Sequence, residues 1–187
     1  MRIIAGAYRS RVLTAPAGMS TRPTSDRLRE TLFNVLAPRI AGARFLDLYA
    51  GSGAVGIEAL SRGAASVKFV ERTAPALKAL RANLAALRIE SGFSVHATGV
   101  AAFLREPRSG AAEFDLVFLD PPYEAGEEYE GTLGALGGEG SGFLAAGAVV
   151  ISEHRRKVEL EESYGSLRRT RVLKQGDAAL SFYEVKE

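Results

Sequence analysis

The feature that most constrains the fold is a glycine-rich turn between a short apolar segment and a helix-like one. Residues 45–48 read Phe-Leu-Asp-Leu, an apolar run of strand type, and the glycine turn at 51–53 follows them. The stretch 55–62 is helix-like and is closed by Gly63, a residue type that commonly follows a helix. Strand, glycine turn and helix in this order predict one unit of a sheet that carries helices on its faces.

The same alternation continues along the chain. Six further runs of strand type follow, at residues 66–70, 94–97, 115–119, 148–151, 167–173 and 178–185. Apolar stripes at helical spacing separate the earlier runs, and the last two flank a Gln-Gly-Asp turn that is typical of an antiparallel hairpin. We therefore predict a Rossmann-like α/β fold, with a mostly parallel seven-stranded sheet, a C-terminal antiparallel hairpin and helices on both faces.

The chain of 187 residues has the size of one ordinary domain. We expect residues 1–40 to form a basic extension and a helix, capped by Thr24 or Ser25 and ended by Pro38, that pack on a main domain at 41–187. The chain has no cysteine and two histidines, which excludes a disulfide scaffold and a thiolate-ligated metal, so no metal is expected. No apolar run approaches the about 20 residues of a membrane span. These observations favour a cytoplasmic protein, and nothing requires more than a monomer.

The charge is distributed unevenly. Residues 1–44 carry eight arginines against Asp26 and Glu30, a net charge of +6, so the remainder of the chain carries −4 of the total of +2. A basic N-terminal arm indicates contact with a polyanion such as nucleic acid, because guanidinium groups pair well with phosphates. A solvated arginine-rich surface is the alternative. Two further basic clusters, at 155–157 and 168–171, are interpreted as protection of an exposed strand edge against aggregation.

The glycine turn matches a ligand-binding pattern. Residues 51–56 fit G-x-G-x-x-G, and Glu71 follows Gly51 by 20 residues, where a carboxylate accepts from ribose hydroxyls. This pattern does not choose between NAD, FAD and S-adenosylmethionine, and a tight turn without a ligand is the structural alternative. Asp47 favours S-adenosylmethionine, because its carboxylate would face the ammonium group of that cofactor and would repel a pyrophosphate.

A second motif, Asp120-Pro121-Pro122-Tyr123, directly follows the strand-like run at 115–119. Two prolines make the turn rigid and leave its carbonyls free to accept hydrogen bonds. The Asp120 carboxylate and the Pro121 carbonyl would accept both N–H groups of an exocyclic amine on a nucleobase, which aims the nitrogen lone pair at an electrophilic methyl group. Tyr123 would stack on the base. Methyl transfer to a base amine by positioning and electrostatics is the chemistry that this motif favours.

With these motifs in place, the sequence resembles the RsmD family of bacterial class I methyltransferases, which methylate the N2 amine of one guanine in small-subunit ribosomal RNA with S-adenosylmethionine. The resemblance rests on three segments: residues 2–11 with their arginines, the Arg-Pro-Thr segment at 22–34, and residues 46–64 around the glycine turn. It extends from residue 2 to about residue 123. The Arg-Pro-Thr segment is the most specific, because other methyltransferases lack it.

The resemblance implies roles for particular residues. The guanine would be held by the catalytic residues Asp120, Pro121, Pro122 and Tyr123. The cofactor would be held by Asp47, Ala50, Gly51, Ser52, Gly53, Glu71, Arg72, Gly99 and Val100. Thr98, Gly99 and Val100 offer no carboxylate for the adenine amine, which departs from many relatives, so backbone groups would read the adenine. The RNA, 16S ribosomal RNA within an assembled 30S subunit or a late precursor, would be bound by Arg2, Arg9, Arg11, Arg22, Thr24, Asp26 and Arg29.

Other functions remain open from the sequence. An N6-adenine methyltransferase acting on DNA or RNA would use the same Asp-Pro-Pro-Tyr motif, although 187 residues leave no room for a sizeable target-recognition domain. An NAD-dependent oxidoreductase would explain the glycine turn and leave the second motif idle, and a non-catalytic RNA-binding factor would explain only the charge. His96 and Asn83 are expected to be structural, and Glu153 and His154 are left open as substrate contacts.

Overall fold

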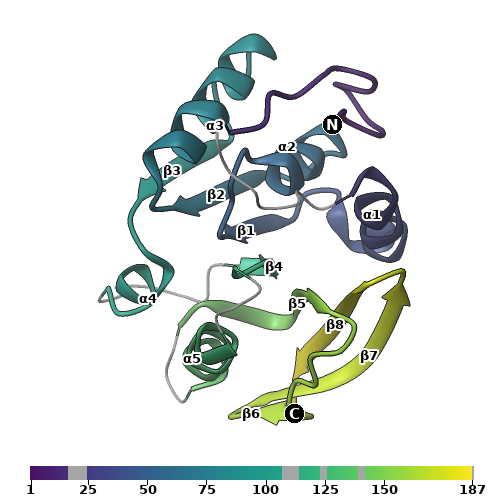
Figure 1. Ribbon diagram of the computed structural model, residues 1–187, viewed down its shortest axis with the longest axis vertical. Helices are drawn as coiled ribbons and strands as arrows, with labels where there is room; N and C mark the ends of the chain where they lie inside the picture. The colour runs from purple at the N-terminus through teal and green to yellow at the C-terminus, as the bar shows by residue number, and fades with distance from the viewer. Residues whose placement is uncertain (17–24, 107–113, 123–125, 139–141, 187) are drawn as a thin grey trace.

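A single twisted sheet forms the centre of the computed structural model, which describes residues 1–16, 25–106, 114–122, 126–138 and 142–186 (Figure 1). Within these residues the sheet has eight strands in the order β3-β2-β1-β4-β5-β8-β7-β6. The strands are β1 (Arg44–Leu48), β2 (Ser66–Glu71), β3 (Phe93–Ala97), β4 (Phe114–Leu119), β5 (Leu144–Arg155), β6 (Ser163–Tyr164), β7 (Leu167–Gln175) and β8 (Ala178–Val185). The helices are α1 (Asp26–Ile40), α2 (Ala54–Ser61), α3 (Ala74–Ala86), α4 (Val100–Phe103) and α5 (Gly126–Gly137).

The strand directions confirm the predicted sheet. β1 pairs in parallel with β2 and β4, and β4 pairs in parallel with β5. β8 returns antiparallel to β5, and β7 is antiparallel to β8, which gives the C-terminal hairpin. The sheet has eight strands and not the expected seven, because β6 adds two residues that pair with β7. A strand of two residues is too short to show any periodicity in the sequence.

Both faces of the sheet are covered by helices, as the sequence predicts. Along β1 the buried side chains alternate, so that Phe45 joins a core cluster with α1, α2 and α3, while Leu46 joins a second cluster with α4 and α5. Figure 1 shows these two groups of helices on opposite sides of the central strands. The carboxyl ends of β1, β2, β3 and β4 therefore meet at one edge of the sheet, between the two helical layers.

The first helix differs from its prediction at its end. The Ser25 hydroxyl caps α1 by accepting the N–H of Leu28 at 3.1 Å, and Thr24 lies outside the described residues. The helix continues through Pro38 to Ile40 and does not stop at the proline. Leu36 and Ile40 are buried in the core, and this burial stabilises a last turn that lacks only the one N–H group of Pro38. Among the described residues, no helix is long and apolar enough to cross a membrane.

Candidate active site

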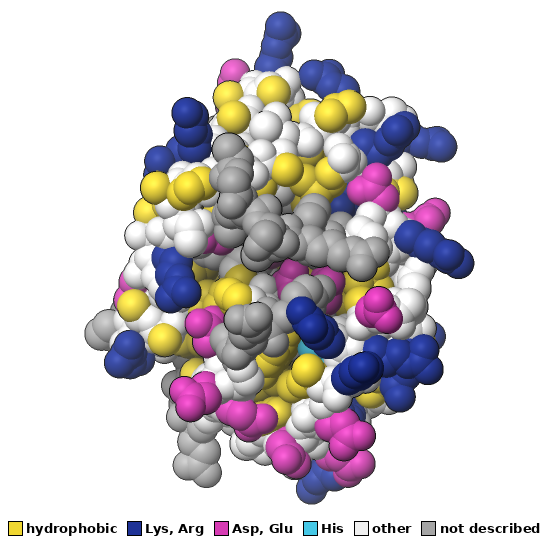
Figure 2. Space-filling model, in the orientation of Figure 1, with side chains coloured by type: hydrophobic (Ala, Val, Ile, Leu, Met, Phe, Trp, Pro, Cys, Tyr) yellow, Lys and Arg dark blue, Asp and Glu magenta, His cyan; other side chains and the backbone are white. Residues whose placement is uncertain are grey.

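A cavity of about 800 Å³ opens at the carboxyl ends of the parallel strands. It is lined by residues that follow β1, β2, β3 and β4, by α5, and by Ala15 and Pro16 of the N-terminal segment. Figure 2 shows acidic side chains at the centre of this face. The cavity brings together most of the predicted cofactor and catalytic residues, namely Asp47, Ala50, Gly51, Ser52, Glu71, Arg72, Gly99, Val100, Asp120, Pro121 and Pro122. Tyr123 lies outside the described residues.

The glycine turn is built so that α2 can start directly against the sheet. Gly53 has a φ of 80°, and a Cβ at this position would lie 2.3 Å from a methyl carbon of Leu80 on α3. A larger residue is therefore excluded both by the backbone conformation and by the packing. Gly53 was assigned to the cofactor from the sequence, but it does not line the cavity and instead forms the N-cap of α2.

Asp47 holds the beginning of α2 from within the sheet. Its carboxylate accepts the N–H of Gly56 at 2.9 Å, and the side chain is 1% exposed. Burial raises the pKa of Asp47 to about 7, the Gly56 hydrogen bond opposes this shift, and the charge of Glu71 adds to it. A cationic group placed in the cavity against Asp47 would favour the ionised carboxylate. Asp47 is therefore suited to face a cationic group of a ligand.

Glu71 is fixed by four donors. One carboxylate oxygen accepts the N–H of Gly51 at 2.9 Å, and the other accepts the N–H groups of Arg72 and Thr73 and the Thr73 hydroxyl at 2.7 to 2.9 Å. The carboxylate thereby ties the end of β2 to the glycine turn after β1. A ribose that contacted Glu71 would meet a carboxylate whose orientation is set before the ligand binds.

Asp120 lines the same cavity and lies directly after β4, the strand that pairs with β1 beside Asp47. Burial raises the pKa of the Asp120 carboxyl well above its ordinary value, and the charges of Glu153 and Asp47 raise it further. Among the described residues, no hydrogen-bond donor reaches its carboxylate. Pro121 is buried and Pro122 is exposed, so the start of the turn is anchored in the protein while the rest faces outward. Asp120 is thus an acceptor that is free to receive a donor from a ligand.

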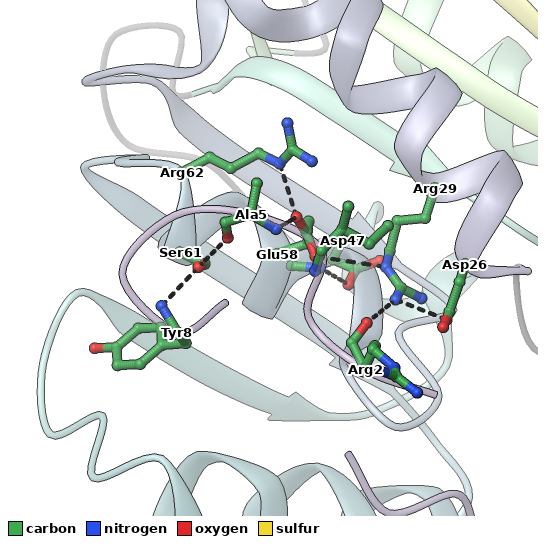
Figure 3. A network of polar contacts seen from close by, with 11 residues as sticks. Arg2, Ala5, Tyr8, Asp26, Arg29, Asp47, Glu58, Ser61 and Arg62 are labelled. Atoms are coloured by element: carbon green, nitrogen blue, oxygen red, sulfur yellow. Dashed lines mark hydrogen bonds and ion pairs between the residues drawn. The ribbon is translucent and has the colours of Figure 1, made fainter. Parts of the chain in front are cut away.

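The N-terminal segment is attached to α2 through a buried acid that sequence reasoning did not single out. Glu58 is fully buried and accepts the N–H groups of Ile4 and Ala5 at 2.8 and 3.0 Å (Figure 3). It also pairs with Arg62 at 2.7 Å and lies 3.7 Å from the Arg29 guanidinium. A Glu in an otherwise apolar helix that leaves the glycine turn was the only signal in the sequence for this role.

Arg29 belongs to this same buried network and not to an RNA-binding surface. It is 0% exposed, its guanidinium forms an ion pair with Asp26 at 3.0 Å, and it donates to the carbonyl of Arg2. A guanidinium without exposed surface does not reach a phosphate, so the assignment of Arg29 to RNA contact is corrected to the attachment of the N-terminal segment. Arg2, Arg9 and Arg11 are exposed, and Asp26 is half-buried. Arg22 and Thr24 lie outside the described residues.

A second attachment point joins the N-terminal segment to the glycine turn. Asn83 of α3 is buried, accepts the N–H of Thr14 at 2.8 Å and donates to the carbonyl of Thr14 at 3.0 Å. The same amide group donates to the carbonyl of Ser52 in the glycine turn at 3.0 Å. The expectation that Asn83 is structural was therefore correct but incomplete, because this residue places Ala15 and Pro16 at the wall of the cavity.

Both histidines have structural surroundings. His154 is buried, with its ring nitrogens 2.8 Å from the Ser181 hydroxyl and 2.9 Å from the Arg155 carbonyl oxygen, and burial lowers its pKa. His96 packs against the ring of Phe103 with 5.2 Å between the ring centroids. Glu153 is 1% exposed, and its charge acts on Asp120 as described above. Neither Glu153 nor His154 is among the described residues that line the cavity.

Comparison with known proteins gives consistent matches over the whole chain. The family model described as conserved hypothetical protein 95 matches residues 1–184. "Putative rRNA methyltransferase YlbH" of Bacillus subtilis is 38% identical over 184 residues, covering 98% of each chain. "Ribosomal RNA small subunit methyltransferase D" of Escherichia coli is 41% identical over 153 residues, which cover 82% of this chain and 74% of that protein.

A solved structure agrees with these sequence matches. "Putative methyltransferase yhhF" from Escherichia coli superposes with a TM-score of 0.85 at 37% identity, and the match covers 100% of this chain and 98% of that one. The match includes the N-terminal segment and the C-terminal hairpin as well as the parallel sheet. The fold is that of the class I methyltransferases, and the cavity described above lies at the edge of the sheet where such a fold binds its ligands.

Proposed function

Because this chain belongs to the conserved hypothetical protein 95 family, which is the RsmD family, we propose that it is a methyltransferase that uses S-adenosylmethionine to modify the exocyclic N2 amine of a guanine in 16S ribosomal RNA. The observation that carries this proposal is the position of Asp120 and Pro121. They line the same cavity as Asp47 and Glu71, so that a base amine and a methyl donor would meet within it.

The residues present fit the proposed cofactor. Asp47 supplies a buried carboxylate whose raised pKa falls back when an ammonium group binds, and Glu71 supplies a fixed acceptor for ribose hydroxyls. Ala50, Gly51 and Ser52 form the wall between these two acids, while Arg72, Gly99 and Val100 line the far end of the cavity. When bound, S-adenosylmethionine supplies an electrophilic methyl group on a sulfonium.

The protein's own contribution to the reaction is to orient the amine and to stabilise the positive charge that develops on its nitrogen. The lone pair of an exocyclic amine is delocalised into the base, which makes the nitrogen a poor nucleophile. The Asp120 carboxylate and the Pro121 carbonyl would accept its two N–H groups and direct the lone pair toward the methyl donor. Since Asp120 has no donor among the described residues and an elevated pKa, it is also suited to hold the proton that leaves the nitrogen.

We propose that the substrate is an assembled 30S subunit or a late precursor and that the protein acts as a monomer beside the ribosome in the cytoplasm. The N-terminal segment supports this proposal, because it presents Arg2, Arg9 and Arg11 to the exterior while Glu58 and Asn83 hold it against the cofactor side of the cavity. A short, rigidly attached basic segment is suited to reading a preformed RNA surface.

A methyl-transfer assay tests the proposed function. The purified protein would be incubated with tritiated S-adenosylmethionine and either protein-free 16S RNA or 30S subunits from a source that lacks this modification, and the RNA would then be digested to nucleosides. We expect labelled N2-methylguanosine, with the intact subunit as the better substrate. Labelled N6-methyladenosine would show that the target is the N6 amine of an adenine and not the N2 amine of a guanine. Normal cofactor binding without a labelled nucleoside would overturn the proposed substrate.

A further inference from the structure

The basic cluster at 155–157 does not lie where the sequence analysis expected it. β5, which ends at Arg155, pairs with β4 on one side and with β8 on the other, so it is an interior strand with no open edge. Protection of a strand edge therefore does not explain Arg156 and Lys157. Edge protection does fit Arg171, because among the described residues β7 pairs with β6 only at Leu167 and Arg168, and no further strand pairs with that side of β7 beyond them.

The parallel register places the end of β5 at the edge of the sheet that carries the cavity. Leu119, the last residue of β4 before Asp120, pairs with Ser152 of β5. β7 has the same direction as β5, because both are antiparallel to β8, and Lys174 reaches this edge two strands further on, beside Ala179. The N–H of Arg156 donates to the carbonyl of Asp177 at 2.7 Å, which holds the segment after β5 against the β7–β8 turn.

The first turn of α1 reaches the same place. The Thr31 hydroxyl is 2.8 Å from the side-chain oxygen of Gln175, the last residue of β7, and 3.1 Å from the carbonyl of Arg27. The backbone of Arg27 is thus linked through Thr31 to Gln175, the chain neighbour of Lys174. The side chains of Arg27, Arg156, Lys157 and Lys174 are all exposed.

Among the described residues, the structure records no ion pair for any of these four side chains. Asp177 lies in the β7–β8 turn next to Arg156 without such a pair. Further along the chain, the backbone of Glu161 bonds to the hydroxyls of Tyr164 and Tyr183 on the β6 side. Figure 2 agrees with this separation, with Lys and Arg side chains beside the centre of the face and Asp and Glu side chains gathered below them.

We propose that Arg27, Arg156, Lys157 and Lys174 form a phosphate-binding surface for the stretch of ribosomal RNA next to the target nucleotide. This inference rests on the proposed function, and it adds a second RNA contact to that of the N-terminal segment. Four basic side chains from three separate elements hold a backbone without reading its sequence, which is what a base drawn into the cavity needs on its flank. The name basic flank is used below for these four residues.

The test compares two double variants, one in the basic flank and one at the far end of the C-terminal hairpin. Arg156→Gln/Lys157→Gln removes one Arg and one Lys from the basic flank. Arg168→Gln/Lys186→Gln removes one Arg and one Lys from the opposite end of the hairpin, where Arg168 pairs with Glu184. All four side chains are exposed, and each variant removes two positive charges, so the net charge changes equally. Binding of unmodified 30S subunits and 16S RNA would be measured over a range of salt concentrations, with melting temperature and cofactor affinity as controls.

We expect the Arg156→Gln/Lys157→Gln variant to bind RNA roughly tenfold more weakly near 0.1 M salt, with a salt dependence of log K that is shallower by about 1.5, as for the loss of two phosphate contacts. The Arg168→Gln/Lys186→Gln variant should bind like the unchanged protein. A charge-conserving exchange, Arg156→Lys/Lys157→Arg, should restore binding, and Arg27→Gln/Lys174→Gln should reproduce the loss from the other two elements.

Equal losses of RNA binding in the Arg156→Gln/Lys157→Gln and Arg168→Gln/Lys186→Gln variants, or no loss in either, would overturn the proposal that the basic flank binds RNA. The methylation assay separates this result from failure of the proposed function. If the unchanged protein methylates the subunit while Arg156→Gln/Lys157→Gln binds normally, the function stands and the surface is rejected. If no ribosomal RNA is methylated and the variant still loses binding selectively, the surface stands and the proposed reaction is rejected.

Discussion

Two acids that line one cavity, Glu71 and Asp120, differ in how the protein holds them. Glu71 accepts four hydrogen bonds from Gly51, Arg72 and Thr73, so its acceptor capacity is directed largely toward the protein. Asp120 receives no donor among the described residues, and burial together with Glu153 and Asp47 raises its pKa. The difference indicates which acid is part of the framework and which is available for chemistry, because a strongly perturbed acid that lines a cavity and lacks a donor among the described residues is a candidate functional group.

The largest expected effect separates these two acids. Asp120→Asn keeps the shape of the side chain and removes the charge that would hold the amine. We expect kcat for methyl transfer to fall by about 10²- to 10³-fold, as when one preorganised electrostatic contact to a transition state is lost, while cofactor affinity changes by a few-fold at most. Asp115→Asn, at the other end of β4 and paired with Arg44, is the matched control and should leave kcat unchanged. A normal kcat in Asp120→Asn would contradict the assigned role.

The pH dependence of the reaction should reflect the raised pKa of Asp120. An acid whose pKa in the folded protein lies above its ordinary value is protonated and inactive as an acceptor until the pH exceeds that raised value. We expect kcat/KM to rise about tenfold per pH unit below the raised pKa of Asp120 and then to level off. Donation from the bound amine lowers the pKa, so the midpoint for kcat should lie below that for kcat/KM. A flat profile from pH 5 to pH 8 would show that Asp120 does not titrate there.

Asp47 lies between the two extremes, with one hydrogen bond and a pKa of about 7. Its folded pKa is above its unfolded value of 3.8, so the protonated acid stabilises the fold at low pH and this contribution is lost as the pH rises from 3.8 through 7. We expect Asp47→Asn to raise the free energy of unfolding by on the order of 2 kcal/mol at pH 8, with little effect near pH 4. Denaturant unfolding at both pH values measures this.

The same Asp47→Asn substitution should weaken binding of the cofactor, since the neutral amide cannot form an ion pair with an ammonium group. Calorimetric binding of S-adenosylmethionine would show the loss. A variant that is more stable but binds less well supports the assignment of Asp47 as a ligand site, whereas a loss of stability at pH 8 would mean that the Gly56 contact requires the charged carboxylate.

The smallest expected effect concerns Glu71. Glu71→Gln replaces one carboxylate oxygen by an NH₂ group, so at least one of the four donors loses its acceptor and the glycine turn loosens. We expect the Kd for S-adenosylmethionine to rise about tenfold, the equivalent of 1.4 kcal/mol, with kcat at saturating cofactor within about twofold of normal. A larger effect on kcat than on Kd would contradict the view that Glu71 acts in cofactor binding while Asp120 acts in the chemical step.

The parts of the site that the sequence predicted are those encoded in short contiguous stretches. The glycine turn, the strand before it and the Asp-Pro-Pro-Tyr motif each occupy fewer than ten residues, and the parallel sheet brings their carboxyl ends together without further information. For this reason Asp47, Glu71 and Asp120 were identified correctly as neighbours, although they are spread over more than 70 positions.

The sequence by itself therefore determined the class of fold, the edge of the sheet that carries the cavity and the acids that face it, because strand and helix patterns and turn chemistry are local properties. Only the tertiary structure decided the role of Glu58, whose partners Ile4 and Ala5 lie more than 50 positions away, and of Asn83, whose partner Thr14 lies 69 positions away. It also moved Arg29 from the RNA to a buried network and gathered the basic flank from three elements. The sequence does not show whether a charged or amide side chain contacts solvent, a phosphate or a backbone group. Its partner is determined by the fold.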